Sequence, residues 1–554
     1  MTAEAPAETA APRGRGVILG AVLLVLFLAA LDQTVVGTAL PRIVTDLQGN
    51  ELYTWVVTSY LLASTITVPI YGNLSDVYGR KLILVISIVI FLGGSALCGV
   101  SQTMVQLIIF RAIQGIGAGA LFPVSLAIIG DLFSPREQGR YQGLFGAVFG
   151  ISFILGPLIG GILTDNATWR WVFYVNLPVG IVALAVIAVT LPNVRKGTSA
   201  RDLDYVGIVL FTAGVVPLLI GLTNKGQTDK SGHLYGWTSP QVGLLLLIAA
   251  VLLALFLLAE RRAKEPIIPL GLFRERSYAA SNVATFFISF AMFTAVIYLP
   301  RYYQAVRGVS ATRSGYETWP ILVGIMGGSI LTGVLISRTG RYKRILLTSM
   351  VILIAGTLLM TRLSADSNNF VLWAWMLLIG VGVGPSMAGF TVVVQSAVPR
   401  SQLGVATSTL TFLRQIGGSV GLAIAGTLFT ETFTRDLPGK LTAAGVPPAF
   451  AGRIADQLGG NLTGVGNTGS QLGRALPPQL RGIIPAVVDG VHRALATAIA
   501  ELFWLGLIAA ILALGTSALI REVPLHATVT PLEEIEQVVG ERPAGRAEAV
   551  FEPH

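Results

Sequence analysis

The stretch Gly72–Lys81 reads GNLSDVYGRK and joins two long apolar runs through a short turn that carries one acid and two bases. Each flanking run is close to the length, about 20 residues, that a helix needs to cross a bilayer. A charged turn of this kind between two such runs is foreign to soluble proteins. It predicts a polar connection at a membrane surface, flanked by two membrane-spanning helices.

The composition of the whole chain leads to the same class of protein. Hydrophobic residues make up 53% of the 554 residues and charged residues 12%, about half of the charged share of a soluble domain. Backbone groups in hydrocarbon must be paired within the structure, so only helices or a closed barrel can span a membrane. Apolar runs this long exclude strands, and the sequence therefore predicts an all-α polytopic membrane protein.

Fourteen apolar runs are expected to span the membrane. They lie near residues 16–40, 53–72, 82–100, 105–129, 141–164, 171–191, 205–223, 240–260, 278–300, 314–336, 344–362, 370–395, 403–430 and 494–520. Lys and Arg concentrate after the even-numbered runs, as in Arg80, Lys81, Arg136, Arg140, Arg195, Lys196, Arg261, Arg262, Lys264, Arg341, Lys343 and Arg344. The positive-inside rule then places both termini in the cytoplasm, and the protein is expected in the plasma membrane. The net charge of +9 thus reports topology, and we expect no nucleic-acid partner.

The charged turn recurs once, as GVLISRTGRYKR at 333–344. Gly333, Gly340 and Arg341 repeat the spacing of the first turn, with Ser337 in place of its acid. Two six-helix halves would put the second turn after the eighth run, and its position after the tenth indicates two inserted helices. The predicted regions are a cytoplasmic tail (1–15), a six-helix bundle (16–191), the inserted helices (192–277), a second six-helix bundle (278–520) with an extracytoplasmic loop (431–493), and a cytoplasmic tail (521–554).

Several motifs together resemble those of a known family. They are LDQTVVGTALP (Leu31–Pro41), the turn Gly72–Lys81, FRAIQGIGAG with Arg111 and Gln114, GLFGAVFGISFILGPLIGG from Gly143, and WRWVFYVNLPVG from Trp169. Over residues 16–430 the chain resembles the major facilitator superfamily, and within it the fourteen-span drug:proton antiporter branch of the EmrB/QacA type. The departures are Ser152, where the antiporter pattern has Gly, and Ser337.

The resemblance implies a proton-coupled efflux antiporter for lipophilic, often cationic, drugs or dyes. A dedicated exporter of a lipid, siderophore or antibiotic is the alternative. A membrane enzyme or receptor would need a catalytic constellation that the sequence lacks, and no cofactor or metal is expected because the four histidines have no ligand-like spacing. The expected partners are small lipophilic substrates, protons and membrane lipids, and the protein is expected to be a monomer.

Three charged residues are candidates for proton coupling. Asp32 lies deep in the first run, where a carboxylate costs several kcal/mol unless it is protonated, paired or exposed to water. Arg111 needs an acid or a cage of carbonyl groups, so pairing and proton coupling both remain open. Glu317 is expected inside the tenth run, either facing a cavity as a second titratable site or cation attractor, or at the outer rim in solvent.

Other residues fall into four groups with structural alternatives. The conformational latch consists of Gly72, Asp76, Gly79, Arg80 and Arg140, with Asp76 accepting bonds from amides at a helix start. The antiporter motif, which the resemblance assigns to close helix packing, consists of Gly143, Gly156, Pro157, Gly160 and Gly161. Cavity candidates are Gln33, Trp55, Tyr60, Phe149, Phe286 and Gln395, although ordinary packing explains any single aromatic residue. Arg414 is assigned to helix packing or an inner gate, and two amphipathic helices are expected to cap the outer mouth from within 431–493.

Overall fold

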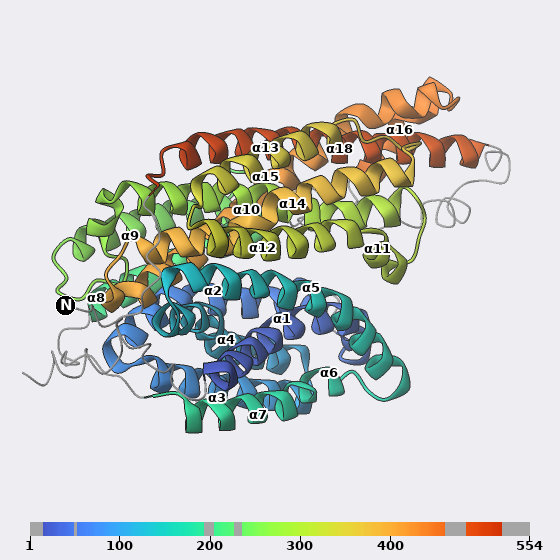
Figure 1. Ribbon diagram of the computed structural model, residues 1–554. Helices are drawn as coiled ribbons and strands as arrows, with labels where there is room; N and C mark the ends of the chain where they lie inside the picture. Colours follow the sequence, from blue (N-terminus) through green and yellow to red (C-terminus); the bar gives the residue numbers. More distant parts are fainter. Residues whose placement is uncertain (1–14, 49–51, 193–203, 226–234, 460–482, 523–554) are drawn as a thin grey trace, which may run out of the picture.

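The computed structural model describes residues 15–48, 52–192, 204–225, 235–459 and 483–522. The described residues form long helices and no strand. The first bundle contains α1 (Arg15–Asp46), α2 (Tyr53–Tyr78), α3 (Arg80–Val100), α4 (Met104–Leu132), α5 (Pro135–Asn166), α6 (Trp171–Tyr174) and α7 (Asn176–Thr190). The second contains α10 (Arg276–Ala305), α11 (Ala311–Glu317), α12 (Trp319–Thr339), α13 (Lys343–Met360), α14 (Asn369–Ser396), α15 (Leu403–Ala443) and α18 (Ile484–Ala518). In Figure 1 the two bundles form two layers, α1–α7 below and α10–α18 above.

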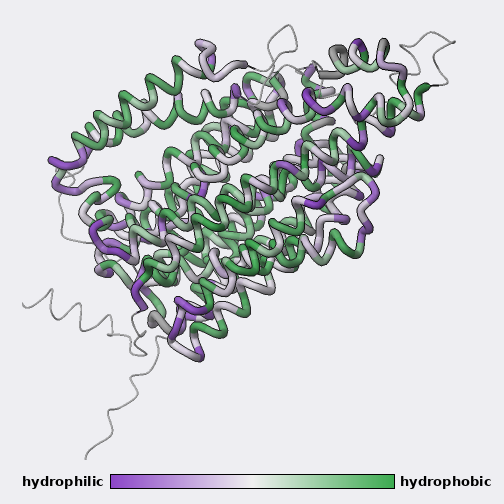
Figure 2. The backbone as a smooth tube through the Cα atoms, turned by 90° about the horizontal axis from the view of Figure 1, so that it is seen from above, coloured by the Kyte–Doolittle hydropathy of each residue, from purple (hydrophilic) through white to green (hydrophobic). Residues whose placement is uncertain are grey.

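Fourteen helices are long and apolar enough to cross a membrane, as predicted. Apolar residues occupy the middles of the helices and hydrophilic residues gather at their ends (Figure 2). The sixth span is built from α6 and α7 with a break at Val175. The tenth span begins at Trp319 and not near 314, because Pro320 stands in the first turn of a new helix and proline favours that position.

The charged turn and its repeat each contain a glycine at positive φ, with ψ of 146° at Gly79 and 10° at Gly340. Gly79 separates α2 from α3 with φ of 95°, and Gly340 ends α12 with φ of 66°. A positive φ is accessible to glycine without steric penalty, so each glycine allows the chain to leave one helix sharply and enter the next. The internal repeat read from the sequence is therefore present in the backbone.

The two inserted helices are α8 (Tyr205–Lys225) and α9 (Leu245–Glu260), the latter preceded by a π-helical turn at Pro240–Leu244. They pack against each other and, through α8, against α2 and α15. Phe211 of α8 lies between Phe256 of α9 and Phe412 of α15, with ring centroids 5.3 and 5.1 Å apart. The pair thus sits beside the seam between the bundles.

The segment predicted as an outer loop is shorter than expected. α15 continues to Ala443 and α18 begins at Ile484, so much of 431–493 belongs to the flanking helices. One short helix, α16 (Pro448–Gly459), packs on α15. The remainder, 460–482, lies outside the described residues, as do the tails 1–14 and 523–554.

The bundles meet closely at the end of the molecule where α2 ends (Tyr78) and α15 begins (Leu403), which we call the latch end. A Cβ on Gly72 would lie 2.0 Å from Oγ of Ser408, and a Cβ on Gly333 would lie 2.2 Å from the carbonyl oxygen of Gly139. These contacts join α2 to α15 and α12 to α5. Because the backbones themselves touch, the latch end is closed in this conformation.

Candidate functional site

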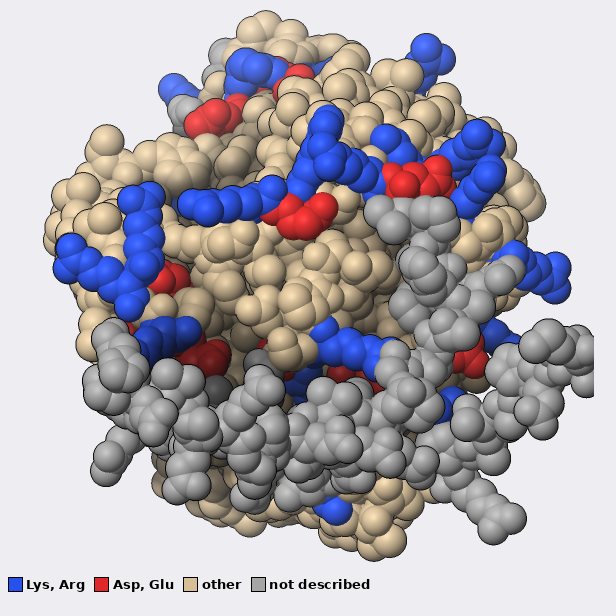
Figure 3. Space-filling model, turned by 60° about the vertical axis from the view of Figure 1, so that its left-hand side comes forward, with Lys and Arg blue, Asp and Glu red and all other residues tan. Residues whose placement is uncertain are grey.

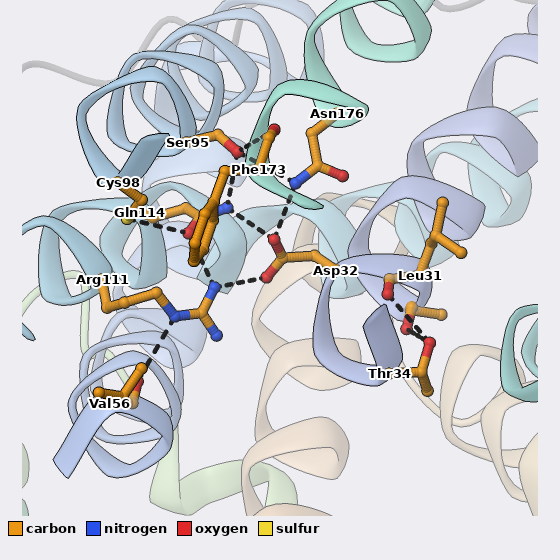
Figure 4. Close-up of polar contacts among 11 residues, drawn as sticks. Leu31, Asp32, Thr34, Val56, Ser95, Cys98, Arg111, Gln114, Phe173 and Asn176 are labelled. Carbon is orange, nitrogen blue, oxygen red and sulfur yellow. Dashed lines mark hydrogen bonds and ion pairs between the residues drawn. The ribbon is translucent and has the colours of Figure 1, made fainter. Parts of the chain in front are cut away.

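The carboxylate of Asp32 lies at the centre of a buried polar cluster inside the first bundle (Figure 4). Its Oδ2 accepts from Nη1 of Arg111 at 2.8 Å. Its Oδ1 accepts from the side-chain amides of Gln114 and Asn176, each at 2.8 Å. Asp32 is 0% exposed and Arg111 is 1% exposed, so the ion pair is withdrawn from water and compensated by hydrogen bonds, as a buried pair must be.

Arg111 is held on every side by the first bundle. Nη1 also donates to Oε1 of Gln114 at 2.8 Å, and Nε donates to the carbonyl of Val56 at 3.4 Å. The guanidinium lies over the ring of Tyr60, 4.1 Å from its centroid, a favourable arrangement for a desolvated cation. Arg111 therefore has partners from α2 and α4 in addition to Asp32.

A second layer fixes the amides that face Asp32. Ser95 of α3 accepts from Asn176 at 3.0 Å and from Gln114 at 3.2 Å, and donates to the carbonyl of Phe173 at 2.9 Å. Asn176 is the first residue of α7, so the break after α6 brings its side chain to the cluster. The cluster thus joins α1, α3, α4 and α7.

The sequence predicted only part of this cluster. Asp32 and Arg111 were expected, and the structure brings them together. Gln114 and Asn176 were quoted within their motifs, but neither was assigned a role, and Ser95 carried no signal. The polar residues recurring in otherwise apolar helices were the available clue, because such residues face inward when lipid surrounds the bundle.

Glu317, the third coupling candidate, lies apart from this cluster. It is the last residue of α11 in the second bundle, ahead of the span that starts at Trp319. Its Oε1 is 3.4 Å from Nε of Arg313, which is largely exposed. Glu317 thus stands two residues ahead of the tenth span and not inside it. Its side chain is only 13% exposed, and its Oε2 is buried without a hydrogen-bond partner among the described residues, so it is not the solvated residue of the outer-rim alternative either.

The latch residue Asp76 joins the two bundles. Oδ1 accepts from the amide of Gly404 at 3.1 Å and Oδ2 from the amide of Val405 at 2.8 Å, both in the first turn of α15. The helix N-terminus carries partial positive charge, which favours a carboxylate there. Asp76 also pairs with Arg80. This is the geometry that the sequence predicted for the acid.

The second acid beside Arg80 is Asp131 of α4, with Nε of Arg80 and Oδ2 of Asp131 3.1 Å apart. The sequence assigned a basic partner, Arg140, to Asp76. The structure instead leaves Arg140 exposed on the surface. The reason is local: Arg140 follows the first turn of α5, and α5 turns its glycine face, including Gly139, toward α12.

A pair of buried glutamines also crosses between the bundles. Nε2 of Gln142 in α5 donates to Oε1 of Gln395 in α14 at 2.7 Å. Nε2 of Gln395 donates to the carbonyl of Leu126 at 3.0 Å and to Oγ1 of Thr407 at 3.2 Å. Gln395 does not line a cavity in this conformation, because its side-chain amide is hydrogen-bonded within the closed interface.

The other cavity candidates occupy varied positions. Tyr60 is 1% exposed and lies against Arg111, so it does not line an open space here. Gln33 is exposed, and Trp55 is half-buried. Phe149 packs edge-on against Phe122 with ring centroids 5.5 Å apart. Phe286, also half-buried, contacts its neighbour Phe287.

The glycines of the antiporter motif serve different contacts. A Cβ on Gly156 would lie 2.0 Å from Oγ1 of Thr34, and one on Gly160 would lie 2.9 Å from the carbonyl oxygen of Val35, so both bring α5 against α1. Gly143 faces Ser329 of α12 across the seam. Pro157 stands inside α5. Around Gly161 a Cβ would meet nothing within 4 Å.

This difference gives a matched test of the α1 and α5 contact. Gly160→Ala is expected to lower the free energy of unfolding by about 1–3 kcal/mol, the usual cost of overpacking, because the added methyl meets backbone. Gly161→Ala, one residue along, should leave stability unchanged. Thermal unfolding of both purified variants in detergent measures the effect. Equal melting temperatures would contradict the assigned contact.

Arg414, assigned to packing or a gate, is buried in the first third of α15. Its Nη2 has no hydrogen-bond partner among the described residues. Metal binding finds no support in the part of the chain that the structure describes, where no group of three His, Cys, Asp or Glu side chains could hold an ion.

Comparison with known proteins places this architecture in a family. The model of the Major Facilitator Superfamily matches residues 22–422. The multidrug transporter protein MdtP of Bacillus subtilis (strain 168) is 39% identical over 453 residues, 81% of this chain and 82% of that protein. Multidrug resistance protein 3 of the same organism is 36% identical over 503 residues, 90% of this chain and 94% of that protein.

Solved structures share the fold at low identity. The human organic anion transporter MFSD10 matches with a TM-score of 0.57 and 16% identity, over 90% of this chain and 100% of that one. The proton:xylose symporter XylE matches with a TM-score of 0.56 and 14% identity, over 91% of this chain and 95% of that one. Both likenesses concern the arrangement of helices alone. With the family match across most of its length and a two-bundle helical fold, the chain belongs to the Major Facilitator Superfamily.

Proposed function

We propose that this protein is a proton-coupled exporter of lipophilic compounds in the plasma membrane, with both termini and the latch end on the cytoplasmic side. Lys and Arg side chains spread over the face shown in Figure 3. Arg140, Arg261 and Arg262 are exposed and lie in or next to the connections assigned to the cytoplasmic side. Basic connections favour the cytoplasm. The names of the two bacterial relatives support export of drugs.

The observation that carries the proposal is the buried pair of Asp32 and Arg111. The carboxylate is held by three donors, and protonation would remove the charge that pairs with Arg111. Binding of a proton and separation of the ion pair are therefore one event. Because the pair joins helices of a single bundle, that event changes how the first bundle packs, and this couples the proton to the movement of the bundle.

Alternating access follows from the contacts at the latch end. The hydrogen bonds from the first turn of α15 to Asp76, and the bond from Gln142 to Gln395, hold the cytoplasmic side closed. A transporter closed on this side is in an outward-facing state. Opening toward the cytoplasm breaks both sets of contacts together. The two bundles then rock about the substrate path between them, as in other transporters built from repeats. Glu317 lies in the other bundle, and a second titratable role for it stays a prediction.

The test is transport by the purified full chain in proteoliposomes with an imposed pH gradient. The panel contains ethidium, 1-pyrenebutyrate, a hydroxamate siderophore and a lysophospholipid. Movement of ethidium or pyrenebutyrate that depends on the gradient supports a drug exporter. Movement of the siderophore or lipid alone supports the dedicated exporter. Transport of any compound that is indifferent to the pH gradient, and to its dissipation by an ionophore, contradicts proton coupling.

A further inference from the structure

A buried arginine without an acid stands in the first third of α15. Arg414 lies roughly 16 Å from the start of the helix at Leu403, at 1.5 Å per residue, a depth of about half the 30 Å hydrocarbon core of a bilayer. It is 8% exposed, and its Nη2 is buried without a hydrogen-bond partner among the described residues. No salt bridge within the described residues includes it, unlike Arg80 and Arg111.

The membrane acids near the bundle interior are already engaged. Asp32 is bound by Arg111 and two amides, and Asp76 and Asp131 pair with Arg80 at the latch end. None of these three is free to neutralise Arg414, and no ion pair among the described residues includes it. A guanidinium cannot lose its proton to escape this cost, and an uncompensated buried charge is expensive. Such a residue is explained best by a partner that is not part of the chain.

The face of α15 that carries Arg414 runs from the closed interface to α10. Thr407 and Arg414 lie two turns apart on this face, because side chains at i, i+3, i+4 and i+7 share a face. Thr407 accepts from Gln395 in the closed interface at the latch end. Gly418 and Gly421, beyond Arg414 on the same face, pack against α10, so Arg414 stands between the closed interface and the aromatic residues of α10.

Aromatic side chains flank the same stretch of α15. Gly417, Gly418 and Gly421 pack closely against Phe286, Phe293 and Phe290 of α10. On another side, Phe412 contacts Phe211 of the inserted helix α8 at 5.1 Å between centroids. A planar apolar body can pack on such rings, while an oxyanion can accept two parallel hydrogen bonds from a guanidinium.

We propose that Arg414 binds the carboxylate, or an equivalent oxyanion, of the transported compound, and that the substrates are aromatic amphiphiles with a negative group. The inference rests on the proposed export function and specifies its substrate class. A permanently cationic dye would meet a like charge at this point. Arg414 is thus a specificity-determining residue and not only a packing or gate residue.

The experiment measures binding of three matched probes to the detergent-purified full chain at pH 7. The probes are 1-pyrenebutyrate, 1-pyrenebutanol and pyrenebutyl-trimethylammonium, which share the ring and differ in charge, and binding is followed by pyrene fluorescence. The wild type is expected to bind the anion at least tenfold more tightly than the alcohol. Arg414→Gln should remove that preference and leave the affinity for the alcohol unchanged, whereas Arg414→Lys should keep part of it.

The matched control is Arg140→Gln, which removes an exposed arginine and should change none of the three affinities. An equal loss for all three probes in Arg414→Gln would show a structural role and overturn the proposal. So would an unchanged preference for the anion. If that variant does not fold, a wild type that binds the anion no better than the alcohol overturns the proposal by itself.

Failure of this inference is distinguishable from failure of the export function. If the wild type shows no preference for the anion but transports substrate when a pH gradient is imposed, the export function is supported and the proposed role of Arg414 is wrong. With charge preference but no such transport, Arg414 binds anions in a protein that does not couple to protons.

Discussion

Asp32→Asn is expected to reduce transport driven by a pH gradient to the level of protein-free vesicles. The amide matches the carboxyl group in size but carries neither the charge that pairs with Arg111 nor an exchangeable acid proton. Movement of substrate down its own gradient should persist, because the latch and the path between the bundles are untouched. The measurement is uptake in proteoliposomes with and without an imposed gradient.

The same substitution leaves Arg111 buried without an anion, which costs about 3–5 kcal/mol when a buried pair is broken. A second variant separates this loss of stability from the loss of coupling. In Asp32→Asn combined with Arg111→Gln no charge remains, so the melting temperature should recover while coupling stays absent. Full pH-driven transport by either variant would show that Asp32 does not carry the proton.

Asp76→Asn should shift the protein toward a state that is open at the latch end. The carboxylate accepts from two amides at the start of α15 and pairs with Arg80. An anion in a partly buried site at a helix N-terminus is worth up to about 2 kcal/mol, and Arg80 retains Asp131. A loss of about 2 kcal/mol raises the ratio of open to closed molecules roughly thirtyfold.

Spin labels at the exposed positions 140 and 339 report this ratio as a distribution of distances across the latch end. The control is Asp46→Asn, which breaks an exposed pair between Arg42 and Asp46 and should leave the distribution alone, since exposed pairs contribute little. An unchanged distribution in Asp76→Asn would mean that the glycine and glutamine contacts close the latch end without the acid.

Much of the fold follows from local sequence. Apolar length predicts spans, the repeated turn predicts two halves, and its displacement after the tenth run predicts the inserted helices. Gly79 and Gly340 were recognisable from the repeated spacing of the charged turn, and the structure places both at positive φ. The ends of the helices were harder to predict from the sequence. A proline at position 320 is compatible with a bend inside a span and with the start of one, and the apolar run alone placed Glu317 in the membrane.

Contacts between the halves could not be read from the sequence. Asp76 was expected to meet a helix start, yet nothing local identified Gly404 and Val405 as the donors. Gln142 and Gln395 are separated along the chain by 253 residues, and polarity in a span indicates an inward face without indicating what it meets. Gln395 was therefore assigned to a cavity that this conformation closes.

The central claim is that the carboxyl group of Asp32 takes up the coupling proton, and infrared difference spectroscopy tests it most directly. Purified protein in lipid is shifted from high to low pH, and the stretching band of newly protonated carboxyl groups is recorded. The account predicts a band in the wild type that is missing in Asp32→Asn and present in the control Asp46→Asn. An Asp32→Asn spectrum that matches the wild type throughout the pH range would contradict the account.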